Sequence, residues 1–198
     1  MNLNKNEESK SIDYEERRNW EEYWLIDPLD GTKEFIKRNG EFTVNIALIE
    51  NGVPIMGVIY VPVEDTLYIG SEEGAFKYEE YASDAQVKKQ LPLPKRDRKY
   101  TVVGSRSHMS PETAAFFQEK KKEYGEVEVM AVGSSLKFCM LAEGKADAYA
   151  RYAPTMEWDT GAGHAIALAA GFNVVKYNTS EALEYNKEDL LNPWFLVS

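Results

Sequence analysis

The chain has 198 residues, a formal net charge of −10 and an apolar fraction of 43%, which is ordinary for a globular protein. This length suits one domain, or two small lobes packed as one, with a substantial core. The negative charge argues against binding to polymeric nucleic acid, which requires a basic surface. A small anionic substrate remains compatible with it, because bound Mg²⁺ ions can invert the potential of an acidic pocket.

The sequence carries no targeting or membrane signal that we recognise. The single cysteine, Cys139, rules out an internal disulfide framework and fits a reducing compartment. No apolar run approaches the roughly 18–20 residues that span a bilayer. The polar residues 1–18 lack the apolar core of a signal peptide. We therefore expect a soluble, cytoplasmic protein without an integral membrane segment.

A buried strand over residues 23–26 is the first element predicted, after a lead-in of residues 1–20 that we expect to be weakly ordered or peripheral. Asp27 and Asp30 follow at the end of this strand. Pro28 biases Asp27 away from helix, so both carboxylates would converge at one strand end. Hard divalent cations prefer such clusters of carboxylate and carbonyl oxygens.

Gly31 and Thr32 complete this first motif. Gly31 permits a tight turn, and Thr32 can cap the helix expected next. The backbone N–H groups of such a turn suit a phosphate. The alternative is a turn without chemistry, because turns use Asp, Pro and Gly frequently.

The middle of the chain predicts an antiparallel meander. Strands are expected over residues 42–50 and 53–61, joined by a two-residue Asn-Gly turn, and over residues 66–71 and 74–78. Residues 79–99 are polar with two prolines, and we expect an irregular connection there.

From residue 100 onward, alternating strands and helices imply an α/β lobe. A Ser-Pro-Glu sequence at residues 110–112 is typical of a helix start, and Gly144 and Gly171 of helix ends. We therefore expect an N-terminal lobe of residues 1–99, with the meander and the metal site, and a C-terminal α/β lobe of residues 100–198. The predicted strands of the second lobe are 100–104, 127–132, 146–151, 172–176 and 194–197, and its later helices are 134–143 and 160–170.

A second acidic motif, Glu-Trp-Asp-Thr-Gly at residues 157–161, precedes a run of small residues. Asp159 lies just before the predicted helix, where an isolated aspartate is often only a cap. Its carboxylate can also hold a metal or a substrate hydroxyl. We expect His164 and Cys139 to pack in the core rather than to bind a ligand.

These motifs together resemble a known family. Residues 24–35 resemble the metal-binding signature of the lithium-sensitive, magnesium-dependent phosphatase superfamily, which includes the inositol monophosphatases. Their Lys-Glu-Phe ending, at residues 33–35, resembles the 3′(2′),5′-bisphosphate nucleotidases of the CysQ type. Residues 157–164 resemble the Trp-Asp motif of the same superfamily. The resemblance extends from about Glu7 to the C-terminus.

The resemblance implies an α/β layered sandwich, like that of inositol monophosphatase and fructose bisphosphatase, and a cofactor of two or three Mg²⁺ ions. The implied metal ligands are Glu7, Asp27, Leu29 through its carbonyl, Asp30 and Asp159, and the implied catalytic residues are Asp30, Thr32 and Glu7. A solvated charged tail is the alternative explanation of the two glutamates near residue 7.

Substrate-binding residues are implied in the same way. Hydroxyl, guanidinium and imidazole groups at residues 105–108 suit a phosphate or nucleotide, although by composition alone a capped turn is commoner. Arg151 would contact a second phosphate. The full implied set is Leu29, Asp30, Gly31, Thr32, Ser105, Arg106, Ser107, His108, Gly133, Ser134, Lys137, Arg151 and Asp159.

The implied reaction is Mg²⁺-dependent hydrolysis of 3′-phosphoadenosine 5′-phosphate to AMP and phosphate, so the partner is a small phosphorylated molecule. One alternative is a phosphatase of the same superfamily that acts on inositol or sugar phosphates.

Family members also carry an earlier helical segment, whose acid positions the attacking water, and no such motif occurs here. This leads us to expect an N-terminally truncated member without the first helical layer, and makes a non-catalytic metal- or nucleotide-binding fragment a further alternative. An uncovered apolar sheet face would favour a homo-oligomer.

Overall fold

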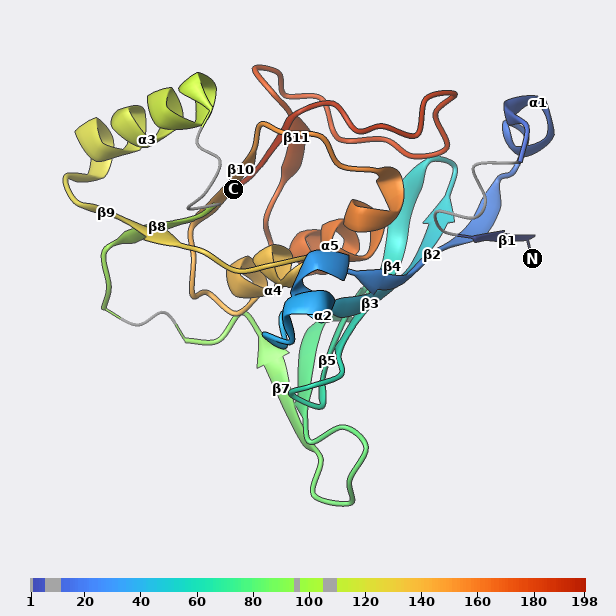
Figure 1. Cartoon of the computed structure of the whole chain (residues 1–198), viewed down its shortest axis with the longest axis horizontal. Coiled ribbons are helices and arrows are strands. Elements are labelled where there is room, and N and C mark those ends of the chain that lie inside the picture. The colour runs from blue at the N-terminus through green and yellow to red at the C-terminus, as the bar shows by residue number, and fades with distance from the viewer. Residues whose placement is uncertain (1, 6–11, 95–96, 105–109) are drawn as a thin grey trace.

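Two β-sheets and five helices make up the computed structural model (Figure 1), which describes residues 2–5, 12–94, 97–104 and 110–198. The first sheet has the spatial order β1 (Asn2–Lys5), β2 (Glu22–Asp30), β3 (Thr43–Glu50), β4 (Val53–Val61), β5 (Thr66–Ser71), β6 (Gly74–Glu79) and β7 (Val87–Leu91). The second has the order β11 (Val174–Lys176), β12 (Phe195–Val197), β10 (Ala148–Arg151), β8 (Tyr100–Val103) and β9 (Val127–Met130). The helices are α1 (Tyr14–Arg17), α2 (Thr32–Lys37), α3 (Pro111–Tyr124), α4 (Leu136–Ala142) and α5 (Glu157–Ala169).

The helices α4 and α5 lie between the two sheets (Figure 1). Helix α5 packs across β2 to β6 and also contacts β11, while α4 packs against α5 and β10. Helix α3 contacts β9 and β10 of the second sheet. The main core fills the space between these layers and includes Tyr23, Ile59, Phe138, Ile166 and Phe195, all at most 2% exposed. The layered α/β sandwich predicted from the sequence is therefore present.

The antiparallel meander was predicted closely. Strands β2 to β7 pair with their neighbours in antiparallel fashion, and β1 pairs in parallel with β2. Asn51 and Gly52 have φ values of 50° and 77°. Two consecutive positive φ values are what a two-residue hairpin turn with the right strand twist requires.

Glycines allow α5 to lie directly on the first sheet. A Cβ atom at Gly57 would lie 2.2 Å from the carbonyl oxygen of Ala162, and one at Gly70 would lie 2.4 Å from Cα of Ile166. No side chain fits at such distances, so the two bare strand positions and the small residues of α5 together set the distance between helix and sheet.

Two expectations about the first half of the chain were wrong. Residues 79–99 are not wholly irregular, because β7 pairs with β6 at the sheet edge. Its exposed, lysine-rich sequence is a common protection of edge strands and conceals the period-two pattern. The lead-in is not merely peripheral either: β1 joins the sheet, and Arg17 of α1 is only 3% exposed.

The outer face of the first sheet also carries apolar side chains. Ile26, Ile46, Val58, Ile69 and Phe76 stand in one row across five strands and are half-buried. Self-association through this face stays a prediction, as does the division into lobes at residues 99 and 100. None of the described helices is both long and apolar enough to cross a membrane.

Candidate functional site

The first acidic motif lies at the end of β2, as predicted. The pairing of β2 with β3 shifts register between Asp27 and Asp30, so the strand is irregular where the two carboxylates occur. Asp27 is 6% exposed, and its Oδ1 atom accepts a hydrogen bond of 3.0 Å from the Leu29 backbone N–H. In a regular strand, residues three positions apart point to opposite faces of the sheet. The Asx turn and the register shift interrupt this alternation, so that the carboxylates of Asp27 and Asp30 can meet.

The carboxylate of Asp30 is held by three donors from two parts of the chain. Its Oδ2 atom accepts hydrogen bonds of 2.6 Å from the Ser135 backbone N–H, 3.3 Å from Asn45 Nδ2 and 3.5 Å from Thr43 Oγ1. The hydroxyl of Ser135 also donates to Asn45 Oδ1 at 2.7 Å. Burial raises the pKa of Asp30, and the hydrogen bond from Asn45 opposes that change most strongly. The side chain is therefore fixed in orientation before any ligand binds.

Asp159 lies inside α5, not before it as predicted, because the helix begins at Glu157. It is the third residue of the helix, and its Oδ2 atom accepts a 2.7 Å hydrogen bond from the Met156 backbone N–H. This is the acidic half of a capping box. The capping role and the ligand role that the sequence left open are compatible, because Asp159 caps the helix and also offers a carboxylate oxygen to an acidic cluster with Asp27 and Asp30.

Asp27, Asp30 and Asp159 form one acidic cluster. Each offers a carboxylate oxygen, and these three atoms all lie within 4.8 Å of one another. An ion such as Mg²⁺ holds its oxygen ligands at about 2.1 Å, so opposite ligands lie about 4.2 Å apart. The cluster therefore fits a small divalent cation after a minor side-chain adjustment.

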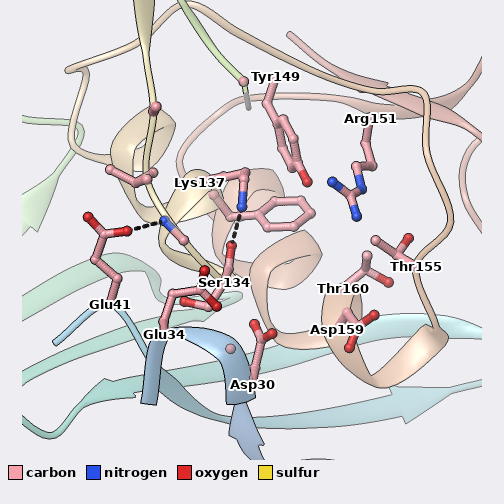
Figure 2. Close-up of a pocket in the computed structure, with 16 residues that line it drawn as sticks. Asp30, Glu34, Glu41, Ser134, Lys137, Tyr149, Arg151, Thr155, Asp159 and Thr160 are labelled. Atoms are coloured by element: carbon pink, nitrogen blue, oxygen red, sulfur yellow. Dashed lines mark hydrogen bonds between the residues drawn. The ribbon is translucent and has the colours of Figure 1, made fainter. Parts of the chain in front are cut away.

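A pocket of about 400 Å³ opens beside this cluster. Figure 2 shows Asp30 and Asp159 along one side, with Lys137, Tyr149 and Arg151 facing them. We call these two sides the acidic wall and the cationic wall. The acidic wall comes from β2 and α5, and the cationic wall comes from α4 and β10. The remaining lining residues are Gly31, Glu34, Glu41, Gly104, Ala131, Val132, Gly133, Ser134, Phe138, Thr155 and Thr160.

The cationic wall is held mainly through backbone carbonyls. Lys137 Nζ donates to the Ser134 carbonyl at 3.0 Å, and an Arg151 Nη2 atom donates to the Pro154 carbonyl at 2.9 Å. The Nε atom of Arg151 is buried without a hydrogen-bond partner among the described residues. Burial, followed by the nearby Arg151 guanidinium, lowers the pKa of Lys137 to about 8. Burial raises the pKa of Tyr149 to about 12, so its hydroxyl remains a donor at neutral pH.

The other predicted residues fall into three groups. Gly31 has φ of 88° and precedes α2 as its N-cap, so Thr32 is the exposed first helical residue and not the cap that we expected. Gly133 and Ser134 line the pocket, and the Gly133 N–H donates to Glu41 at 2.8 Å. A third group lies outside the described residues: Glu7, Ser105, Arg106, Ser107 and His108.

Several residues of the site were not predicted. Thr43 and Asn45 occupy inward positions of β3, where the alternating pattern otherwise places Ala47 and Ile49. Polar residues on a buried strand face near two acids are a signal that sequence inspection could have used. Glu41 and Tyr149 carry no such signal, because only the tertiary fold brings them to the pocket. The core role of His164 and of Cys139 is confirmed: both are at most 2% exposed, and His164 Nδ1 lies 3.0 Å from the Tyr185 hydroxyl.

Comparison with known proteins agrees with this geometry. Residues 3–196 match the pattern of the Inositol monophosphatase family. The chain belongs to this family. It is 50% identical to the 3′(2′),5′-bisphosphate nucleotidase CysQ of Salmonella typhimurium over 187 residues, which cover 93% of this chain and 71% of that protein. It is 38% identical to the protein of the same name from Haemophilus influenzae, covering 96% of this chain and 69% of the relative.

Solved structures of the family show the same fold. The crystal structure of CysQ from Bacteroides thetaiotaomicron superimposes with a TM-score of 0.92 at 51% identity, covering all of this chain and 76% of that one. A 2′-AMP-bound SaIMPase-II structure matches with a TM-score of 0.75 at 22% identity, which supports the fold alone. The predicted resemblance to CysQ-type members of the family is thereby confirmed.

Proposed function

We propose that this chain is a Mg²⁺-dependent phosphomonoesterase that hydrolyses 3′-phosphoadenosine 5′-phosphate to AMP and phosphate. The observation that carries the proposal is the pairing of two opposite walls in one pocket: Asp30 and Asp159, two members of a cluster of three carboxylates, line it across from a lysine and an arginine. A substrate with two phosphates needs both kinds of group. The CysQ relatives, at about half identity, bear the name of a nucleotidase that acts on such a molecule.

In this proposal the acidic wall holds the metal. Asp27, Asp30 and Asp159 would be ligands, with the Leu29 carbonyl and Glu7 completing a site for two or three ions. When bound, such ions neutralise phosphate charge and lower the pKa of a coordinated water. The hydrogen bonds to Asp30 keep its carboxylate aimed at the cluster, so little reorganisation accompanies binding.

The scissile phosphate would lie against the turn at Gly31 and Thr32. Gly31 follows Asp30 directly and is the N-cap of α2, in the left-handed conformation. The backbone N–H groups of Gly31 and Thr32 would bind phosphate oxygens. The Thr32 hydroxyl would orient the attacking water. In-line attack on phosphorus forms one P–O bond and breaks the bond to the ribose 3′ oxygen, which takes up a proton. No covalent link to the protein is required.

The second phosphate would lie against the cationic wall. Arg151 and Lys137 keep donors beyond those used for backbone carbonyls, and charge-assisted hydrogen bonds to phosphate are strong. Gly133 and Ser134 would line the path between the two phosphates, and the serine, arginine, serine and histidine of residues 105–108 would add further contacts. We propose that the reaction takes place in the cytoplasm, since the one cysteine is a buried free thiol.

Phosphate release from 3′-phosphoadenosine 5′-phosphate, measured with Mg²⁺ and after chelation with EDTA, tests this proposal. Inositol 1-phosphate is the comparison substrate. Mg²⁺-dependent release from the nucleotide alone is the expected result. Release from inositol 1-phosphate alone would instead identify an inositol phosphatase. Calorimetric binding of nucleotide without any release would identify a non-catalytic binding protein.

A further inference from the structure

The first turn of α5 is surrounded by buried polar groups that do not line the pocket. Glu157, the first residue of the helix, is 1% exposed and lies two residues before Asp159. A buried carboxylate is costly unless it is well hydrogen-bonded, and a buried ion pair is weak evidence for stability. The contacts of Glu157 therefore indicate what this charge does.

Glu157 binds a short segment of the C-terminal loop, residues 186–188. One carboxylate oxygen accepts a 2.8 Å hydrogen bond from the Asn186 backbone N–H. The other accepts 3.0 Å from the Lys187 backbone N–H and 2.5 Å from Lys187 Nζ. Both oxygens are thus used, and the helix start is tied to the loop by three bonds.

Arg17 of α1 holds the same segment from its other side. Its guanidinium donates to Asn186 Oδ1 at 3.0 Å, to the Lys187 carbonyl at 2.6 Å and to the Glu188 carbonyl at 2.8 Å. In return, Asn186 Nδ2 donates to the Arg17 carbonyl at 2.7 Å. The loop is therefore hydrogen-bonded on one side to α1 and on the other to α5.

Asn192 completes the attachment of the turn. Its Nδ2 atom donates to the Met156 carbonyl at 2.7 Å and to Thr160 Oγ1 at 3.0 Å. Asp159 and Thr160 are the residues of this turn that line the pocket. Both belong to the network: Asp159 accepts from the Met156 N–H, and Thr160 Oγ1 accepts from Asn192. The acidic cluster joins β2 to α5, so its geometry depends on where this turn sits.

We propose that Glu157 is a positioning residue for Asp159: it anchors the first turn of α5 through residues 186–188 and Arg17, and so sets the affinity of the acidic cluster for a divalent cation. The inference rests on the proposed role of Asp159 as a metal ligand. Partners that orient ligands are typically worth roughly 10- to 100-fold in metal affinity. A loss in that range is expected when Glu157 no longer holds the loop.

The test compares Glu157→Gln with Glu143→Gln in the full chain. Glu143 is a matched control: it is 3% exposed and bonds to Tyr68 and Lys77, but it does not line the pocket. Calorimetric titration with Mg²⁺ and thermal unfolding without metal are measured on both variants. We expect Glu157→Gln to weaken Mg²⁺ binding about tenfold or more, and Glu143→Gln to lower the melting temperature with Mg²⁺ affinity unchanged.

A folded Glu157→Gln variant with wild-type Mg²⁺ affinity would overturn the inference, and so would an equal loss of affinity in the Glu143→Gln control. If Glu157→Gln does not fold, Arg17→Gln decides, because it loosens the same loop from outside: weaker Mg²⁺ binding supports the inference and unchanged binding refutes it. The proposed function fails separately, if the wild-type chain binds no Mg²⁺ or if Asp159→Asn binds it as well as the wild type.

Discussion

The two walls of the pocket are built in different ways. On the acidic wall, short side chains are held by nearby donors: Asp30 accepts from Ser135, Asn45 and Thr43, and Asp159 accepts from the Met156 backbone N–H. On the cationic wall, the long side chains of Lys137 and Arg151 are anchored through backbone carbonyls and keep further N–H groups for a ligand. A site that must hold a metal at fixed geometry needs the first arrangement, and a site that recognises a distal phosphate can use the second.

Removal of the Asp30 charge from the acidic wall is expected to have the largest effect on activity. The rate of phosphate release by the Asp30→Asn variant should fall by more than roughly 100-fold, which is the upper loss when a hydrogen-bond partner of a metal ligand is removed. The effect should be larger here because the charge of the ligand itself is removed. The fold should persist, since the variant replaces a charge whose burial is unfavourable. Phosphate release and thermal unfolding are the measurements. Asp147→Asn is the control, because Asp147 accepts hydrogen bonds from Arg98 and from the Thr101 N–H and does not line the pocket. Near-normal turnover in Asp30→Asn would refute the acidic wall as the reaction site.

Removal of the Arg151 side chain should change substrate preference more than turnover. Charge-assisted hydrogen bonds contribute roughly 1.5–3 kcal/mol, so Arg151→Ala should lower kcat/KM for 3′-phosphoadenosine 5′-phosphate roughly 10- to 100-fold. With 3′-AMP, which lacks the second phosphate, the loss should be much smaller. The ratio of the two kcat/KM values is the measurement, and an unchanged ratio would show that the second phosphate does not contact the cationic wall.

The pH dependence of Lys137 gives a smaller effect. Its pKa of about 8 means that it is charged at pH 7 and loses its proton as the pH rises through 8. An anion prefers the charged form, so the affinity for AMP should fall above pH 8, by at most about tenfold per pH unit. Calorimetry between pH 7 and 9.5 checks this. The Lys137→Gln variant should bind AMP more weakly than the wild type at pH 7, and its affinity should not fall further above pH 8.

The smallest effect concerns α5, the helix that supports the acidic wall. Burial lowers the pKa of His164 from 6.5 to about 4. The unfolded chain then binds more protons below pH 6.5, so this residue lowers stability as the pH falls from 6.5 towards 4. At pH 5 the expected cost is about 2 kcal/mol relative to pH 7. Urea unfolding of the wild type and of His164→Gln at pH 5 and pH 7 measures this cost. An equal loss of unfolding free energy in the two proteins would show that His164 is not its source.

The strands and the acidic residues could be predicted from local sequence. Apolar periodicity, the Asn-Gly turn and the Ser-Pro-Glu helix start each act over a few residues, and the structure agrees with them. Asp27 and Asp30 were selected as candidate ligands in the same way, because the proline and glycine around them are visible in the sequence. For Asp159 the local sequence indicated mainly a helix cap, and its ligand role was implied by the family resemblance. Edge strand β7 was missed because its exposed lysines follow no apolar period.

Residue spacing by itself determined that two acidic motifs exist and that each ends or begins a regular element. Only the tertiary structure decided that Asp159 reaches the pair on β2, that Thr43, Asn45 and Ser135 hold Asp30, and that residues 186–188 anchor α5. The three donors to Asp30 are 13, 15 and 105 residues away in the chain, and Asn186 is 29 residues from Glu157. Local propensity has no information about such pairs, because their proximity follows from how the helices pack between the two sheets.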